Sequence, residues 1–130
     1  MSKSETLTKG KEVVKMNANE LKNLAHAKMV EAMNLLKMAY EVAEVEVAHA
    51  EADEAHTAAV VTRFEAMYPV FEGLPNFEAD MDTAYDVHER AWRKADLLRY
   101  DAEQIDSAMI NLRDALDNIE DTWEYEEIGC

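Results

Sequence analysis

The clearest pattern in the sequence is a row of mostly apolar positions at alternating spacings of three and four residues. We call it the C-terminal seam, and it comprises Met81, Ala84, His88, Ala91, Ala95, Leu98, Ala102, Ile105, Met109, Leu112, Leu116, Ile119 and Trp123. This spacing keeps the side chains on one stripe of an α-helix that packs on another helix as in a coiled coil. We therefore predict a long helix over residues 77–124.

The first half of the chain carries two such rows. The first seam is Met29, Met33, Leu36, Tyr40, Ala43, Val47, Ala50, Val61, Phe64 and Tyr68, interrupted by Glu54 and Thr57. The second seam is Leu21, Ala25, Ala32, Leu35, Ala39, Val42, Glu46, His49, Asp53, His56 and Val60. Both rows predict one long helix over residues 17–68.

Two seams on one helix indicate more than one neighbouring helix, because a single partner covers a single apolar stripe. We therefore predict self-association, most simply two hairpins that form a four-helix bundle, or a higher homo-oligomer. The residues expected to carry it are large members of the first and C-terminal seams: Met29, Met33, Leu36, Tyr40, Val47, Leu98, Ile105, Leu112 and Ile119.

The helix breakers gather in one place. Residues 69–76 hold both prolines and one of the three glycines of the chain, and they predict a single turn. Asn17 or Asn19 can cap the first helix and Asn76 the second. The predicted fold is an all-α, antiparallel two-helix hairpin, with a flexible basic arm over residues 1–16 and an acidic tail over 125–130.

Charge supports the hairpin independently. The net charge is −15, but residues 1–37 carry seven lysines against four acids, whereas residues 38–62 carry six acids and no base. Folding the chain back near residue 72 brings the lysine-rich start to the acidic end, and brings the bases between Arg90 and Arg99 to the acids between Glu46 and Glu54. Opposite blocks that meet in this way favour antiparallel helices.

Composition excludes several classes of function. The acidic charge opposes direct binding to nucleic acids or anionic membranes. No apolar run is long enough to span a bilayer, and the single cysteine, Cys130, provides no disulfide framework or metal cluster. The start of the chain lacks the apolar core of a signal peptide, so we expect a cytoplasmic protein.

One group of residues could carry chemistry. Glu46, His49, Asp53 and His56 share a helix face, and Glu46-Val-Ala-His49 matches the Glu-x-x-His element of di-iron carboxylate bundles. Carboxylates and imidazoles on facing helices bind Fe, Mn or Zn. The alternative is that these polar positions interrupt the seam to fix helix register. No nucleotide-binding loop or nucleophile–base pair is present, so we expect no enzymatic activity and no cofactor.

Acidic side chains recur along the expected outer faces. They include Glu41, Glu44, Glu51, Asp101, Asp114, Asp117 and Asp121, which are the candidate partner-binding residues. A rod of carboxylates can occupy the basic cleft of a nucleic-acid-binding protein, as some small viral proteins do, or can simply remain solvated. The sequence thus predicts a non-enzymatic protein that self-associates and binds another protein, as an assembly factor or as an acidic inhibitor. The alternative is a metal- or ligand-binding helical bundle.

Overall fold

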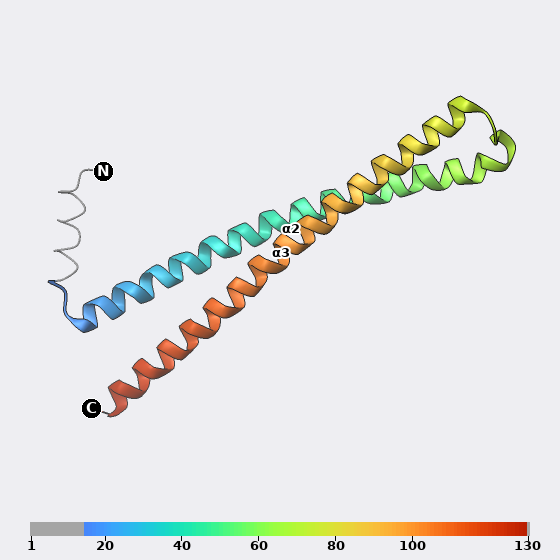
Figure 1. Ribbon diagram of the computed structural model, residues 1–130. Helices are drawn as coiled ribbons and strands as arrows, with labels where there is room; N and C mark the ends of the chain where they lie inside the picture. The colour runs from blue at the N-terminus through green and yellow to red at the C-terminus, as the bar shows by residue number, and fades with distance from the viewer. Residues whose placement is uncertain (1–14, 130) are drawn as a thin grey trace, which may run out of the picture. The chain divides into compact units, whose positions relative to one another are not determined.

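The computed structural model describes the backbone of residues 15–129 and the side chains of residues 15–121. In this part of the chain, helix α2 spans Ala18–Phe71 and helix α3 spans Pro75–Gly129, with a short turn between them (Figure 1). The predicted all-helical, two-helix hairpin is confirmed. The predicted basic arm over residues 1–16 lies almost wholly outside the described residues, as does Cys130.

Helix α2 begins with the first of the two predicted caps. The backbone N–H of Glu20 donates to Oδ1 of Asn17 at 2.8 Å, and the Asn17 amide donates to the Glu20 carboxylate at 3.0 Å. The N–H of Leu21 donates to the Asn17 carbonyl oxygen at 3.0 Å. Asn17 therefore occupies the N-cap position and satisfies an N–H group that the first helical turn leaves without a backbone acceptor.

Helix α2 ends at Phe71, later than the predicted residue 68, and Pro69 lies inside it. A proline removes its own N–H and clashes with the preceding turn, but in the last turn no further helix depends on the lost hydrogen bond. Aromatic packing holds the helix ends together, because the ring of Phe77 lies 5.4 Å from that of Phe71 and 5.5 Å from that of Phe64, centroid to centroid.

Helix α3 begins at Pro75, so the prediction that Asn76 caps it is wrong. The N–H of Glu78 donates to the Leu74 carbonyl at 3.1 Å, which makes Leu74 the N-cap. Pro75 then stands at the first helical position, where its missing N–H has no intrahelical partner to lose. Gly73 has a φ of 85°, which a side chain would strain, and its N–H donates to the Glu78 carboxylate at 3.2 Å.

The other end of α3 also differs from the prediction. We expected the helix to stop near residue 124 and to leave an acidic tail over residues 125–130. The backbone instead stays helical to Gly129. No proline interrupts this segment, and its last glycine lies at the helix end, where glycine is best tolerated.

The chain divides into two compact units. The terminal unit, as described, pairs residues 15–37 with 108–129, and the turn unit pairs residues 38–107. All described members of the first and C-terminal seams are buried or half-buried, Glu54 and Thr57 included. The buried apolar side chains are Met33, Ala43, Ala50, Val61, Ala84, Ala95, Met109 and Leu116. Because alanine fills half of these positions, the core is narrow.

Neither α2 nor α3, over the residues described, combines the length and the apolar character needed to cross a membrane.

Candidate functional site

A polar layer crosses the helix interface of the turn unit. The Thr57 hydroxyl donates to the carbonyl oxygen of Glu54 at 2.9 Å, and the same oxygen lies 2.9 Å from Nδ1 of His88. Because the single hydroxyl hydrogen is used by the Glu54 carbonyl, the Thr57 oxygen accepts from His88, which places a proton on Nδ1. Thr57 and His88, two of the polar positions in the otherwise apolar seams, are therefore joined to each other.

Arg99 extends this polar layer. Its guanidinium lies 3.4 Å from the Glu54 carboxylate, 3.6 Å from Glu51 and 3.6 Å from Asp96. Burial alone lowers the pKa of Arg99, but the hydrogen bond to Glu54 and the three carboxylates raise it above its usual value. Arg99 therefore stays charged and links α3 to α2 through Glu51 and Glu54. This is the pairing that the charge blocks predicted for the middle of the hairpin.

The sequence pattern predicted the charge pairing but not the contact between Thr57 and His88. A signal for it existed, since each residue is the polar member of an apolar seam. They also stand at nearly equal distances from Gly73 on either side of the turn. In an antiparallel hairpin such positions lie opposite each other.

In the terminal unit, the predicted pairing between the start of α2 and the acidic end of α3 is found at His26. Its Nε2 lies 2.8 Å from the Glu120 carboxylate. Glu120 is one of the acids that the charge pattern placed opposite the lysine-rich start. The group that pairs with Glu120 is thus the imidazole of His26, which lies on the lysine-rich stretch of α2.

The predicted metal ligands Glu46, His49, Asp53 and His56 are all exposed on α2. No group of three or more His, Cys, Asp or Glu side chains in the described residues converges in a way that could hold a metal ion. His88, the histidine of α3, is hydrogen-bonded to Thr57. The four residues therefore share a helix face but are not brought together with ligands from α3.

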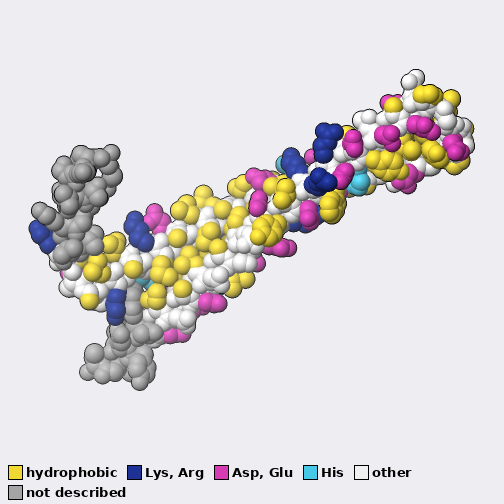
Figure 2. Space-filling model, viewed as in Figure 1, with side chains coloured by type: hydrophobic (Ala, Val, Ile, Leu, Met, Phe, Trp, Pro, Cys, Tyr) yellow, Lys and Arg dark blue, Asp and Glu magenta, His cyan; other side chains and the backbone are white. Residues whose placement is uncertain are grey.

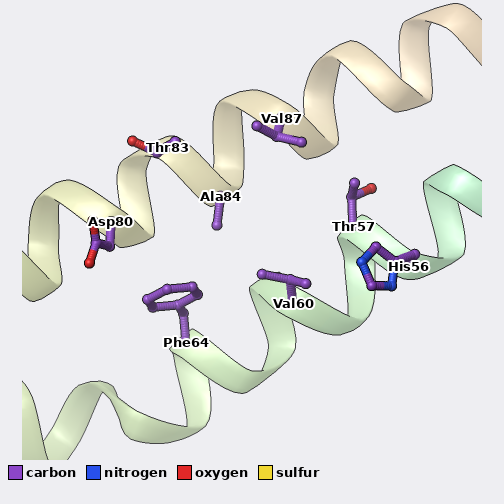
Figure 3. A pocket seen from close by; sticks show the side chains of 8 residues that line it. All are labelled: His56, Thr57, Val60, Phe64, Asp80, Thr83, Ala84 and Val87. Carbon is purple, nitrogen blue, oxygen red and sulfur yellow. The ribbon is translucent and has the colours of Figure 1, made fainter.

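Two pockets lie on the side of the turn unit that carries these four residues. The first, about 260 Å³ in volume, is lined by His56, Thr57, Val60, Phe64, Asp80, Thr83, Ala84 and Val87. In Figure 3, Val60 and Phe64 of α2 and Ala84 of α3 point into the space between the helices. The second pocket, about 430 Å³, is lined by Met38, Ala39, Val42, Ala43, Glu46, Leu98, Asp101 and Ile105.

These pockets define a surface that we call the second-seam face. On α2 it follows the second seam from Ala39 to Val60, and residues of this stretch line both pockets. On α3 it follows a stripe with spacings of three, four or seven residues: Thr83, Val87, Arg90, Lys94, Asp101 and Ile105. The face is apolar at both ends and charged in the middle.

The opposite side of the turn unit carries a third pocket. This pocket, about 400 Å³, is lined by Tyr40, Glu44, Val47, Ala48, Glu51, Arg99, Ala102 and Glu103. A hydrogen bond to the Glu44 carboxylate, together with the negative charge of that carboxylate, raises the pKa of Tyr40. On the surface shown in Figure 2, the Lys and Arg side chains of the turn unit gather in its middle, while acidic side chains are spread along it.

The seven predicted partner-binding acids are all exposed, as a solvent-facing carboxylate display requires. The nine predicted self-association residues have a different environment. Each is buried or half-buried, on the stripe where α2 and α3 of one chain face each other. The hairpin itself thus uses these side chains, and the second seam is the apolar row left uncovered.

Comparison with known proteins identifies no relative: no protein-family model, no curated protein and no solved structure matches this chain.

Proposed function

We propose that this chain is a non-enzymatic assembly protein whose hairpin self-associates through the second seam of α2. The observation that supports this proposal is the exposure of large apolar side chains next to a narrow core. Leu35 is 60% exposed, Met38 62% and Val42 59%, while no large side chain among the described residues is fully buried. Covering a side chain of this size contributes roughly 1.5–3 kcal/mol, so a second helical surface is a strong source of stability.

Sedimentation equilibrium at micromolar concentration tests the proposal. We expect the wild-type chain to sediment as a dimer or a larger homo-oligomer. Val42→Glu places a charge on the second seam and should shift the population to monomer. Ala48→Glu is the matched control, because Ala48 is exposed on the opposite side of the same helix. A wild-type chain that stays monomeric at every concentration would contradict the proposal.

The second part of the proposal is an acidic surface that binds a protein with a basic surface. It rests on the exposure of Glu41, Glu44 and Glu51 along α2 and of Asp101, Asp114, Asp117 and Asp121 along α3. Carboxylates at helical intervals steer basic partners and compete with nucleic acids for them. Such a surface suits an assembly factor and equally an inhibitor of a nucleic-acid-binding protein.

A competition experiment separates these two roles. The chain, immobilised through its N-terminus, is exposed to a cell lysate with and without added duplex DNA. If bound proteins are basic, are released by DNA, and are lost with Glu41→Gln, Glu44→Gln and Glu51→Gln together, the inhibitor role is supported. Proteins that remain bound in the presence of DNA support the assembly role instead.

The alternative function is a metal-binding bundle that uses Glu46, His49, Asp53 and His56. One exposed stripe on one helix supplies too few converging ligands, so this role requires ligands from another copy. Adding Zn²⁺, Mn²⁺ or Fe²⁺ must then raise the melting temperature, because a ligand that binds only the folded state stabilises it. An unchanged melting temperature would exclude the alternative.

A further inference from the structure

The second-seam face has complementary charges on its two helices. Its middle carries Asp53 on α2 and Arg90 and Lys94 on α3, and Glu46 and Asp101 stand beside the second pocket, all five exposed. Within the described part of the chain, no side chain of these residues takes part in a hydrogen bond or ion pair. The basic residues next to them do have partners, since Arg99 pairs with Glu51 and Glu54, and Arg93 pairs with Glu89 at 2.6 Å.

The apolar ends of the same face are also uncovered. Towards the turn, Val87 is 44% exposed beside the first pocket, and at the other end Met38 and Val42 are about 60% exposed beside the second pocket. A partner that covers this face must therefore be apolar at both ends and must carry both charges in the middle. A second copy of the same face meets these conditions.

We infer that two copies dock through their second-seam faces with the turns at the same end, so that α2 of each copy lies on α3 of the other. This inference rests on the proposed self-association and specifies its surface and its geometry. The two-fold axis runs along the length of the hairpins, and the interface is isologous, so every contact occurs twice. All neighbouring helices are then antiparallel, as in many four-helix bundles.

The charges favour this dimer over the other dimer with two-fold symmetry. Thr57 lies level with His88, and Glu51 and Glu54 lie level with Arg99, so Asp53 lies near the level of Lys94, whereas Glu46 stands level with Asp101 beside the second pocket. Turning the second copy about the long axis preserves these levels and places Asp53 against Lys94 of the other copy, with Arg90 one turn further along. The alternative turn, about an axis across the hairpins, places α2 on α2 and acids against acids, and like charges juxtaposed in this way oppose docking.

Charge reversal tests the pairing. The acid-reversed chain carries Asp53→Lys, and the base-reversed chain carries Arg90→Glu and Lys94→Glu. We expect each to dimerise at least about tenfold more weakly than the wild type by sedimentation equilibrium. An equal mixture of the two should form a heterodimer of near wild-type affinity. That recovery also shows that both reversed chains fold.

Matched controls separate local pairing from total charge. Glu44→Lys changes the net charge as the acid reversal does, but on the opposite side of the turn unit. Arg93→Glu with Arg113→Glu changes it as the base reversal does, at exposed positions off the stripe. Both controls should dimerise with an affinity close to that of the wild type.

The direction of the two copies is tested at the turn. In a Cys130→Ser background, Val70→Cys places a single thiol at a position that is 78% exposed. Spin labels on this thiol should lie within roughly 20 Å of each other, since neighbouring helices in a bundle are 8–10 Å apart. With the turns at opposite ends they would be roughly 60 Å apart, from the rise of 1.5 Å per residue.

The outcomes distinguish this inference from the function on which it rests. A wild-type dimer with weakened reversed chains, a recovered heterodimer and close labels supports both. A dimer that resists both reversals, or whose labels lie far apart, overturns this docking geometry and leaves self-association standing. A monomeric wild-type chain overturns both.

Discussion

Ala95 is the position where the close approach of α2 and α3 can be tested most directly. It has no exposed surface, whereas the other buried apolar side chains retain 4–9% exposure. Ala95 lines none of the three pockets described above, and its complete burial means that a larger side chain must displace its neighbours. We predict that Ala95→Leu destabilises the hairpin even though it makes the seam more apolar.

The expected magnitude follows from two opposing effects. Three added carbon atoms would contribute about 0.8 kcal/mol each if they entered free space. Without that space they force side chains off their preferred rotamers or push the helices apart, and overpacking of this kind destabilises by about 1–3 kcal/mol net. Steric repulsion therefore outweighs the gain in buried apolar surface, and the free energy of unfolding should fall.

Urea unfolding followed by circular dichroism at a fixed protein concentration measures the effect. Ala52→Leu is the control, because Ala52 is exposed on α2 and leucine has nearly the helix propensity of alanine. The control should change the free energy of unfolding by less than about 0.5 kcal/mol. Equal stability of Ala95→Leu and the wild type would refute the close packing described for this seam.

Three further predictions concern single interactions. Asn17→Ala should destabilise the start of α2 by about 1 kcal/mol and speed hydrogen exchange in its first turn, whereas Asn23→Ala, inside the helix, should not affect that turn. A hydrogen bond of 2.9 Å from the Tyr85 hydroxyl to Glu65 raises the pKa of Tyr85, so its stabilisation is present below pH 10 and is lost as the pH rises through the folded-state pKa. Glu65→Gln should lower the Tyr85 pKa in a spectrophotometric titration, and an unchanged titration would exclude the pairing. Arg99→Leu should lower the free energy of unfolding in low salt and lower it less in high salt, because the pair is partly exposed, and a salt-independent loss would contradict an electrostatic role.

The spacing of apolar residues predicted most of the fold because helical period alone decides which side chains share a stripe. Each described member of the C-terminal seam, from Met81 to Ile119, is buried or half-buried as expected. The turn lies within the predicted residues 69–76, but it is shorter than predicted, because Pro69 stands inside the last turn of α2 and Pro75 is the first residue of α3. The position of Pro75 was missed because Asn76 offered a familiar capping side chain, although the fixed φ and the missing N–H of a proline suit the first helical position.

The site was harder to predict, because periodicity does not say which of two seams α3 covers. Met29 and Leu36 on one seam and Leu21 and Leu35 on the other are similarly apolar. After Glu54 and Thr57 the first seam is apolar again from Val61 onwards. It is therefore apolar over most of its length, as the C-terminal seam of α3 is. Residues assigned from the sequence to self-association thus serve the hairpin, whereas the exposed face depends on tertiary packing that the pattern does not contain.

The tight turn at Gly73 has a consequence for how the chain folds. Contacts in the turn unit widen step by step in sequence: Phe71 packs on Phe77, Thr57 meets His88 across 31 residues, and Arg99 meets Glu54 across 45. Once the innermost contact forms, each further contact closes only a short additional loop, so the entropy lost at each step is small. Folding should therefore proceed like a zipper from the turn outwards, and a substitution that strains Gly73 should slow folding more than it speeds unfolding.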